Sequence, residues 1–274
     1  MRLVNKTIIV TGAARGLGRA CAQQFSANGA NLVLLDVAQN IPGVPYNLGS
    51  ESQLQHTAQL CRQHGSIVTT MNVDIRDARQ VNEAIYEAVK RFGRIDVLLN
   101  NAGVVSPSGK ILHDTSEGDW QLMLDINLTG AWRLMKAAGK FMVEQQQGSI
   151  INIASTAGIV GYRYFAGYVA SKHGVIGLTK AAALDYAPSK VRVNAISPGS
   201  VRDSQSEEGE MLAEIARSLQ IDSTEYESSF IESQPMNALV EPIDIANAAV
   251  WLASDESVRV TGSNITVDAG FSIR

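Results

Sequence analysis

Two residues four positions apart, Tyr168 and Lys172, are the strongest candidates for chemistry in this sequence. On a helix this spacing places both side chains on one face, about one turn apart. A tyrosine with its ordinary pKa of about 10 is a poor proton acceptor at neutral pH, and a neighbouring cation lowers that pKa by favouring the phenolate. The pair can therefore exchange a proton with an alcohol or a carbonyl. A core tyrosine beside a solvated lysine is the alternative, so the surrounding elements must decide.

A glycine-rich turn lies near the beginning of the chain, where it follows a β-branched run at residues 6–10. It reads Gly12-x-x-x-Gly16-x-Gly18, includes Arg15 and Leu17, and continues into an apolar-periodic helix. Such glycines let the backbone approach a pyrophosphate, and the helix N-terminus offers free amides. The spacing differs from the usual Gly-x-Gly-x-x-Gly. An isolated glycine cluster is often a simple turn, but the flanking strand and helix favour a dinucleotide site.

An acidic residue, Asp36, ends the second predicted strand, residues 31–35. A carboxylate about 20 residues after the turn can accept hydrogen bonds from ribose hydroxyls, and it repels a 2′-phosphate. This position predicts NAD rather than NADP, although Asp36 can also be a turn or helix cap. Arg15 is the opposing signal, because it can reach a 2′-phosphate or point to solvent.

Residues 37–50 interrupt the pattern with two prolines and two glycines, which predicts an inserted loop beside the adenosine end of the cofactor. Ser50 and Gln53 are spaced as a capping box for the helix that follows. Asp74 comes directly after a third strand, residues 66–73. It can accept from an adenine amino group or cap the helix that begins near Asp77, and the sequence does not separate these alternatives.

Further polar and small residues follow the later strands, which are predicted at residues 95–99, 149–153 and 191–196. They are Asn100-Asn101-Ala102-Gly103, Ser155 and Pro198-Gly199. A long helical pattern covers residues 119–146 and includes Asn127, a poor helix former. A local kink that holds a water, or an exposed polar position, accounts for it.

Strands and helices alternate from end to end, which predicts an α/β fold of the Rossmann type: a doubly wound, mostly parallel seven-stranded sheet with helices on both faces. No break divides residues 1–274, so we expect one domain. Ligands bind at the carboxyl ends of such strands. The residues predicted at those ends are Gly16, Asp36, Asp74, Asn101, Ser155 and Pro198.

Residues 200–240 are irregular and hold a short helix with Met211, Ile215 and Leu219 on one face. It is either a flap over the active site or an exposed peripheral helix. We expect the substrate pocket to be lined from residues 104–118, 156–165 and 200–238. A partly apolar, cyclic or terpenoid-like substrate is suggested by Tyr162, Tyr164, Phe165, Met211 and Phe230.

The composition is that of an ordinary globular protein, with 45% apolar and 18% charged residues. A net charge of −4 gives no reason to expect nucleic acid or an anionic membrane as partner. Cys21 and Cys61 lack metal-ligand spacing and fit a reducing compartment. Neither a signal-peptide pattern nor a bilayer-spanning run is present. We therefore expect a cytoplasmic protein that binds no metal.

In combination, these motifs resemble the short-chain dehydrogenase/reductase family over nearly the whole chain. They are the glycine turn after Thr11, Asn100-Asn101-Ala102-Gly103, Asn127, Ser155, Tyr168-x-x-x-Lys172 and Pro198-Gly199. The inserted loop around residues 41–46 is similar to that of carveol-dehydrogenase-like members, some of which are associated with the redox cofactor mycofactocin.

The resemblance implies a role for each member of a tetrad. Tyr168 is the general acid/base, Ser155 hydrogen-bonds the substrate oxygen, and Lys172 lowers the pKa of Tyr168 and holds the ribose. Asn127 positions a water that links Lys172 to solvent. The cofactor-binding residues implied are Gly12, Arg15, Gly16, Leu17, Gly18, Asp36, Val37, Asp74, Ile75, Asn101, Ala102, Gly103, Tyr168, Lys172, Pro198, Gly199 and Val201. A homotetramer or homodimer is also implied.

One departure concerns the family pattern Pro-Gly-x-Val-x-Thr, whose threonine contacts the nicotinamide carboxamide. Here Asp203 stands in place of the threonine, and Ser200 or Ser204 can substitute for it.

The leading hypothesis is an NAD-dependent oxidoreductase that interconverts a small secondary alcohol and a ketone. One alternative is an NADPH-linked ketoreductase of a biosynthetic system that acts on carried acyl substrates. Another is a non-catalytic NAD(H)-binding sensor or scaffold. The presence of all four tetrad residues is evidence against this alternative.

Overall fold

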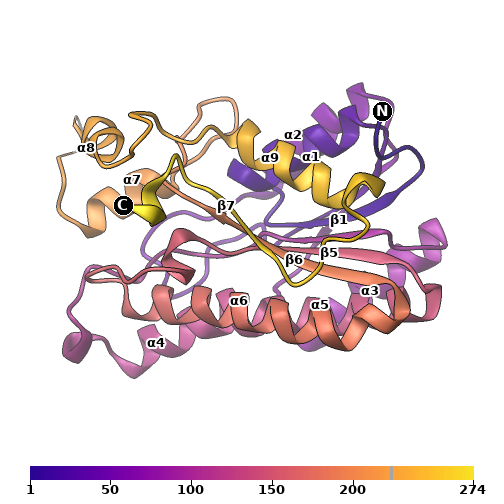
Figure 1. Cartoon of the computed structure of the whole chain (residues 1–274), viewed down its shortest axis with the longest axis horizontal. Helices are drawn as coiled ribbons and strands as arrows, with labels where there is room; N and C mark the ends of the chain where they lie inside the picture. Colours follow the sequence, from indigo (N-terminus) through magenta and orange to yellow (C-terminus); the bar gives the residue numbers. More distant parts are fainter. Residues whose placement is uncertain (223–224) are drawn as a thin grey trace.

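A seven-stranded sheet forms the centre of the computed structural model, which describes residues 1–222 and 225–274 (Figure 1). The strand order is β3-β2-β1-β4-β5-β6-β7, and every neighbouring pair is parallel. The strands are β1 (Thr7–Thr11), β2 (Asn31–Asp36), β3 (Val68–Asn72), β4 (Val97–Asn100), β5 (Gly148–Ile153), β6 (Val191–Pro198) and β7 (Asn264–Val267). The predicted doubly wound fold is confirmed, with a fully parallel sheet.

Helices cover both faces of the sheet because successive strand residues point to opposite sides. In β1, Ile8 and Val10 join the core under α1, α2 and α9, whereas Ile9 joins the core under α3, α5 and α6. Figure 1 shows these two layers above and below the strands. The helices are α1 (Gly16–Ala27), α2 (Glu51–Gln63), α3 (Ala78–Phe92), α4 (Glu117–Leu124), α5 (Ala131–Gln145), α6 (Ala166–Tyr186), α7 (Met211–Ser218), α8 (Tyr226–Glu232) and α9 (Pro242–Ala253).

The helix that begins after the inserted loop has the predicted start. The Ser50 side chain accepts from the Gln53 amide, and the Gln53 side chain accepts from the Ser50 amide, so the capping box of α2 is confirmed. At α3 the cap is Asp77, which accepts from the amides of Arg79 and Gln80. The alternative that Asp74 caps this helix is therefore wrong, because Asp74 lies before the turn that leads to Asp77.

The predicted helix at residues 119–146 is divided into three parts. The first part is α4, the second is a π-helical stretch, η2 (Asp125–Gly130), and the third is α5. Asn127 lies within the π-helical stretch. Single π turns inside α-helices are frequent at functional sites. The unusual residue therefore marks a change in helix type, with the side chain buried, and the exposed position is excluded.

Residues 200–240 place two short helices, α7 and α8, at the end of the sheet where the C-terminus lies (Figure 1). Val201 pairs with Val240, so the excursion begins and ends beside β6. In α7 the buried apolar side chains are Leu212 and Ala216, whereas Met211 is exposed. On the predicted face, Ile215 and Leu219 are partly buried and pack against the core.

Within the described residues, no helix has both the length and the apolar character needed to cross a membrane.

Candidate active site

One large cavity of about 290 Å³ lies at the carboxyl edge of the sheet. Six strand ends contribute to it: Gly12 follows β1, Asp36 ends β2, Asp74 follows β3, Asn101 follows β4, Ser155 follows β5 and Pro198 ends β6. The other predicted residues in its wall are Arg15, Gly16, Leu17, Val37, Ile75, Ala102, Gly103, Tyr168, Lys172, Gly199 and Val201. Parallel strands explain this convergence, because all their carboxyl ends meet at one edge.

Tyr168 and Lys172 lie on α6 and face this cavity together with Ser155. The Lys172 ammonium is 5.6 Å from the centre of the Tyr168 ring. Its Nζ donates to the carbonyl of Ile153 at 2.9 Å, which fixes the side chain against the end of β5. The Ser155 hydroxyl accepts from the Ala157 amide at 3.1 Å, so it is held at the start of the turn after β5.

Burial controls the proton affinity of this pair. It raises the pKa of Tyr168 to about 12, although a hydrogen bond with Ser155 acts in the opposite direction. It also lowers the pKa of Lys172 to about 8. The expected lowering of the Tyr168 pKa by Lys172 is therefore not seen in this structure. The reason is that withdrawing the phenolate from water costs more than the hydrogen bond with Ser155 returns.

Asn127 does not line the cavity but holds the backbone of Val104, which does. Its Oδ1 accepts from the Val104 amide and its Nδ2 donates to the Val104 carbonyl, both at 2.8 Å. The Nδ2 group also donates to the Ser171 hydroxyl at 3.3 Å. Gly103 separates it from the lysine: a Cβ there would lie 3.1 Å from the Asn127 Oδ1 and 3.6 Å from the Lys172 Nζ. The side chain thus fixes the segment after β4.

The glycine turn has two different kinds of glycine. Gly16 has φ of +58° and open space around its Cα, so it serves the turn conformation. Gly18 is not in the cavity wall, which corrects its assignment as a ligand contact. A Cβ at Gly18 would lie 1.9 Å from the Gly12 carbonyl oxygen, so this glycine lets α1 pack against the turn. In the first turn of α1, the Gly16 amide is taken by the Glu207 carbonyl, whereas the Leu17 amide lacks an intrahelical acceptor and is suited to an anion.

Asp36 is a buried carboxylate that backbone amides hold in place at the end of β2. Its oxygens accept from the amides of Ala14 at 2.9 Å and Ala38 at 3.1 Å. Burial raises the pKa of this carboxyl, and those two hydrogen bonds and the Arg15 charge oppose the rise. The inserted loop returns to the same place, since a Cβ at Gly49 would lie 3.1 Å from the Asp36 Oδ1.

Asp74 lines the cavity but is already paired with Arg76, at 2.6 Å between the Arg76 Nη2 and the Asp74 Oδ2. Burial raises the pKa of the Asp74 carboxyl, but the hydrogen bonds from Arg76 outweigh this effect, so the pKa is lowered. The group is therefore a carboxylate with one side committed to arginine.

An acidic segment, residues 206–210, covers the glycine turn. It lies within the range 200–238 predicted for the substrate pocket and lines the cavity, but its contact with the glycine turn was not predicted. The Gly16 amide donates to the Glu207 carbonyl at 2.6 Å. Arg19, whose side chain is fully buried, pairs with Glu208 at 2.9 Å. Arg15 pairs with Glu210 at 2.5 Å, so it points neither to solvent nor freely into the cavity. The Ser-Glu-Glu-Gly-Glu sequence was the available signal, but nothing local relates it to a turn near the N-terminus.

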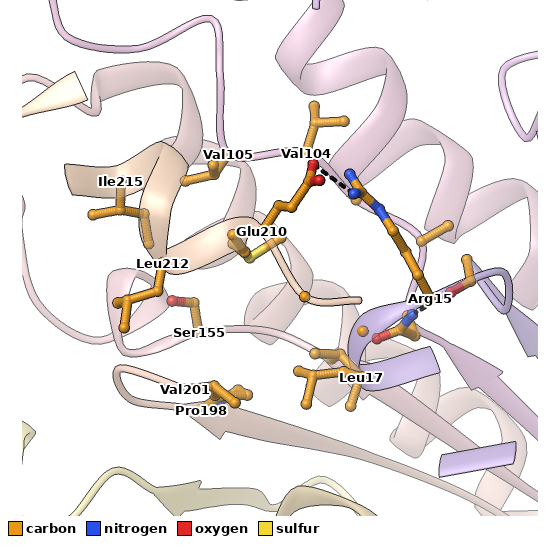
Figure 2. Close-up of a pocket in the computed structure, with 18 of the residues that line it drawn as sticks. Arg15, Leu17, Val104, Val105, Ser155, Pro198, Val201, Glu210, Leu212 and Ile215 are labelled. Carbon is orange, nitrogen blue, oxygen red and sulfur yellow. Dashed lines mark hydrogen bonds and ion pairs between the residues drawn. The ribbon is translucent and has the colours of Figure 1, made fainter. Parts of the chain in front are cut away.

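The wall opposite the strand ends is largely apolar. Figure 2 shows Leu212 and Ile215 of α7 near Val105 and Ser155. Other apolar or aromatic lining residues are Tyr46, Ile126, Tyr162, Phe165, Met211, Leu219 and Phe230. The flap alternative for the α7 region is the one that this geometry supports. Tyr46 was missed; its hydroxyl accepts from the Val105 amide at 3.2 Å and ties the inserted loop to the cavity.

Several predicted pocket residues lie elsewhere. Tyr164 is not in this wall: it has φ of +73° and stacks with Arg163 at 4.8 Å. From the predicted range 104–118, Val104 and Val105 line the cavity. The chain then turns away to the surface. Residues 223–224 of the predicted range 200–238 lie outside the described residues. Ser200 and Ser204, the two candidates for the missing threonine, both line the cavity.

The residues present fit a dinucleotide. Glycines permit close backbone approach, Gly16 and Leu17 at the start of α1 line the cavity, and the buried Asp36 carboxylate ends the adjoining strand. The tyrosine and lysine lie in the same cavity. A doubly wound parallel sheet with these features defines a dinucleotide-dependent oxidoreductase.

Comparison with known proteins assigns the family. A family model described as enoyl-(acyl carrier protein) reductase matches residues 12–272. The (−)-trans-carveol dehydrogenase of Rhodococcus erythropolis is 34% identical over 278 residues, which cover 100% of this chain and 99% of that protein. The trans-4-hydroxycyclohexanecarboxylate dehydrogenase of Sinomonas cyclohexanicum is 35% identical over 98% of this chain and 93% of that protein.

A solved structure agrees with these relatives. The crystal structure of carveol dehydrogenase from Mycobacterium avium in complex with NAD has a TM-score of 0.92 and 33% identity, and the match covers 100% of this chain and 99% of that one. The chain belongs to the short-chain dehydrogenase/reductase family. The resemblance to carveol-dehydrogenase-like members is also confirmed.

Proposed function

We propose that this protein interconverts a secondary alcohol and a ketone with NAD as cofactor and Tyr168 as general acid/base. The observation that carries the proposal is the single cavity that holds Ser155, Tyr168 and Lys172 at one end and Asp36 with the glycine turn at the other. Similarity to two alcohol dehydrogenases and to an NAD-bound structure supports it.

The catalytic residues divide the work in the following way. NAD, when bound, accepts or supplies the hydride. Tyr168 removes the hydroxyl proton of the alcohol in oxidation and returns it to the carbonyl oxygen in reduction. Ser155 donates a hydrogen bond to the same oxygen, where negative charge develops. When Lys172 is protonated, its ammonium group, which donates to the Ile153 carbonyl, places a positive charge beside Tyr168.

The residues around the glycine turn hold the cofactor in this proposal. Asp36 accepts from the ribose hydroxyls, and the Leu17 amide at the start of α1 binds the pyrophosphate. A carboxylate at this position repels a 2′-phosphate, so the site selects NAD. The Asp74 carboxylate is available to an adenine amino group on the side that Arg76 leaves open.

The cavity wall favours a compact, partly apolar substrate. Leu212 and Ile215 of α7 lie near Ser155 (Figure 2), and Phe230 of α8 and Tyr162 also line the cavity. The Tyr162 hydroxyl bonds the Thr156 hydroxyl at 2.8 Å, and its ring stacks on Phe271 at 5.7 Å, so this wall is held in place. Two relatives are named for cyclic secondary alcohols. We therefore expect a cyclic secondary alcohol as substrate.

Titration with both cofactors and a panel of alcohols tests the proposal. NAD⁺ and NADP⁺ binding is measured by calorimetry, and turnover of cyclic, linear and acyl-linked alcohols is followed by NADH absorbance. Tighter binding of NAD⁺ and turnover of cyclic secondary alcohols are expected. Tighter binding of NADP⁺ favours the acyl ketoreductase instead. NAD⁺ binding without turnover of any alcohol or ketone favours a sensor.

We also propose that the chain assembles as a homodimer or homotetramer. Trp132 on α5 and Leu184 on α6 expose 44% and 79% of their surface, and both helices lie in the same layer (Figure 1). Burying such side chains against a second copy removes apolar surface from water. Sedimentation equilibrium of the full chain tests this, and a monomer would contradict it.

A further inference from the structure

The ion pair between Arg15 and Glu210 lies at the Asp36 end of the cavity. Figure 2 shows the two side chains meeting beside Val104, across from Ser155. The Arg15 Nη1 is 2.5 Å from the Glu210 Oε2, and its Nη2 donates to the Asn47 carbonyl at 2.5 Å. Both terminal nitrogens of the guanidinium are therefore engaged, one by the acidic segment and one by the inserted loop.

Glu210 is held in this position by the rest of the acidic segment. The Glu207 carbonyl accepts from the Gly16 amide at 2.6 Å, and the Glu207 carboxylate accepts from Gln23 at 3.0 Å. Glu208 pairs with the buried Arg19 at 2.9 Å. Glu207 and Glu208 are thus attached to α1 at three points, just before Glu210 in the chain. This limits how far the Glu210 carboxylate can move from Arg15.

Arg15 is the cation that a nucleotide 2′-phosphate would meet at this end. Among the described residues of the cavity wall, the other cations are Lys172 and Arg202. Lys172 bonds the Ile153 carbonyl beside Tyr168, and Arg202 pairs with Glu241 at 2.8 Å. Arginine recognises a phosphate through its planar fork of N–H groups, so it must have that fork free.

We propose that Glu210 is a specificity-determining residue for the cofactor, acting by holding the Arg15 guanidinium away from a 2′-phosphate. Asp36 repels that phosphate directly, whereas Glu210 and the Asn47 carbonyl occupy the group that would otherwise bind it. The selection of NAD thus has two parts, one at the end of β2 and one contributed by the acidic segment. The inference rests on the proposed nucleotide site.

Calorimetric titration of NAD⁺ and NADP⁺ into the purified full chain tests this role. Glu210→Gln keeps the shape of the side chain and removes its charge. We expect this change to tighten NADP⁺ binding about three- to tenfold, the range of one hydrogen bond to a charged group in partly exposed surroundings. NAD⁺ binding should change by less than about twofold, since NAD⁺ has no 2′-phosphate for the released arginine. Glu210→Ala is the second variant, with the same expected direction.

Glu208→Gln is the matched control, because it removes the same charge from the same segment. Its amide oxygen can still accept from Arg19, so the segment stays attached and the partner of Arg15 stays in place. It should leave the ratio of the two dissociation constants as in the wild type. In an Arg15→Gln background, Glu210→Gln should no longer change NADP⁺ binding. The inference is overturned by an equal effect of Glu208→Gln, by an equal gain for both cofactors, by no gain for NADP⁺, or by a gain that persists without Arg15.

Asp36→Ser separates this inference from the proposed site. If Asp36→Ser leaves the preference for NAD⁺ unchanged, or if the wild type binds neither cofactor, the proposed nucleotide site is wrong. If Asp36→Ser relaxes the preference but Glu210→Gln does not, the site stands and the role of Glu210 is wrong.

Discussion

Replacing Tyr168 with phenylalanine removes one oxygen atom from the centre of the proposed mechanism and leaves the ring in place. The residue is 8% exposed and belongs to the core under α3, α5 and α6. Phenylalanine fills the same space, so the packing of α6 against the strand ends is retained. The substitution therefore removes the proton carrier without creating a cavity.

The expected effects on stability and on rate differ widely. The lost hydrogen bond with Ser155 costs about 1 kcal/mol of folding free energy. A domain with a stability of about 5–15 kcal/mol remains folded after such a loss. Loss of general acid/base catalysis lowers kcat by about 10²–10⁴, which corresponds to roughly 3–5 kcal/mol in the barrier. A large rate effect with almost unchanged unfolding separates catalysis from structure.

Tyr162→Phe is the matched control for this experiment. It removes the same atom from a second tyrosine in the same cavity, one whose hydroxyl bonds Thr156 at 2.8 Å. Steady-state turnover of a cyclic alcohol, urea unfolding and NAD⁺ titration are measured for both variants. Tyr162→Phe should keep kcat within about tenfold of the wild type, since a lost neutral hydrogen bond is worth about 1 kcal/mol.

Two results would refute the reasoning. The first is near-wild-type kcat in Tyr168→Phe, which would mean that another group carries the proton. The second is an equal loss in Tyr168→Phe and Tyr162→Phe, which would mean that the cavity is sensitive to any lost hydroxyl.

Two further predictions concern proton uptake and the glycine turn. The rate of alcohol oxidation at limiting alcohol should rise with pH, because Tyr168 must lose its proton before it can accept one and burial raises its pKa to about 12. A rate that stays flat or falls as the pH rises would contradict the assignment of Tyr168 as the base. Gly18→Ala should unfold the turn or abolish NAD⁺ binding, since its Cβ would lie 1.9 Å from the Gly12 carbonyl oxygen. Gly16→Ala, with open space around it, should cost about 1–2 kcal/mol of stability from its positive φ, and thermal unfolding that ranks the two variants in reverse would refute this.

Much of the fold could be predicted because its signals are local. The β-branched run at residues 6–10 indicates a buried strand, and Ser50 with Gln53 forms a capping box within a single turn. Boundaries were less certain where two elements join without a break. The residues 119–146 read as one helix, because the π-helical stretch around Asn127 preserves the helical direction and the apolar pattern.

The candidate site was predictable as far as strand order implies it. Once the strands are parallel, the residues after each strand must meet at one edge, and this brings Asn101, Ser155 and Pro198 together without any knowledge of side-chain packing. Gly18 was assigned wrongly because a glycine that approaches a ligand and one that approaches the protein's own backbone look alike in a sequence. The structure distinguishes them through the short distance to Gly12.

By itself, the sequence determined the fold class, the position of the nucleotide turn and the Tyr168–Lys172 pair, because each depends on spacing within one or two elements. The tertiary structure decided the proton affinity of Tyr168, the engagement of Arg15 by Glu210 and the wall contributed by Tyr46. These depend on burial and on contacts between segments far apart in the chain. Burial and long-range pairing follow from how the whole sheet and its helices pack, and no local pattern encodes them.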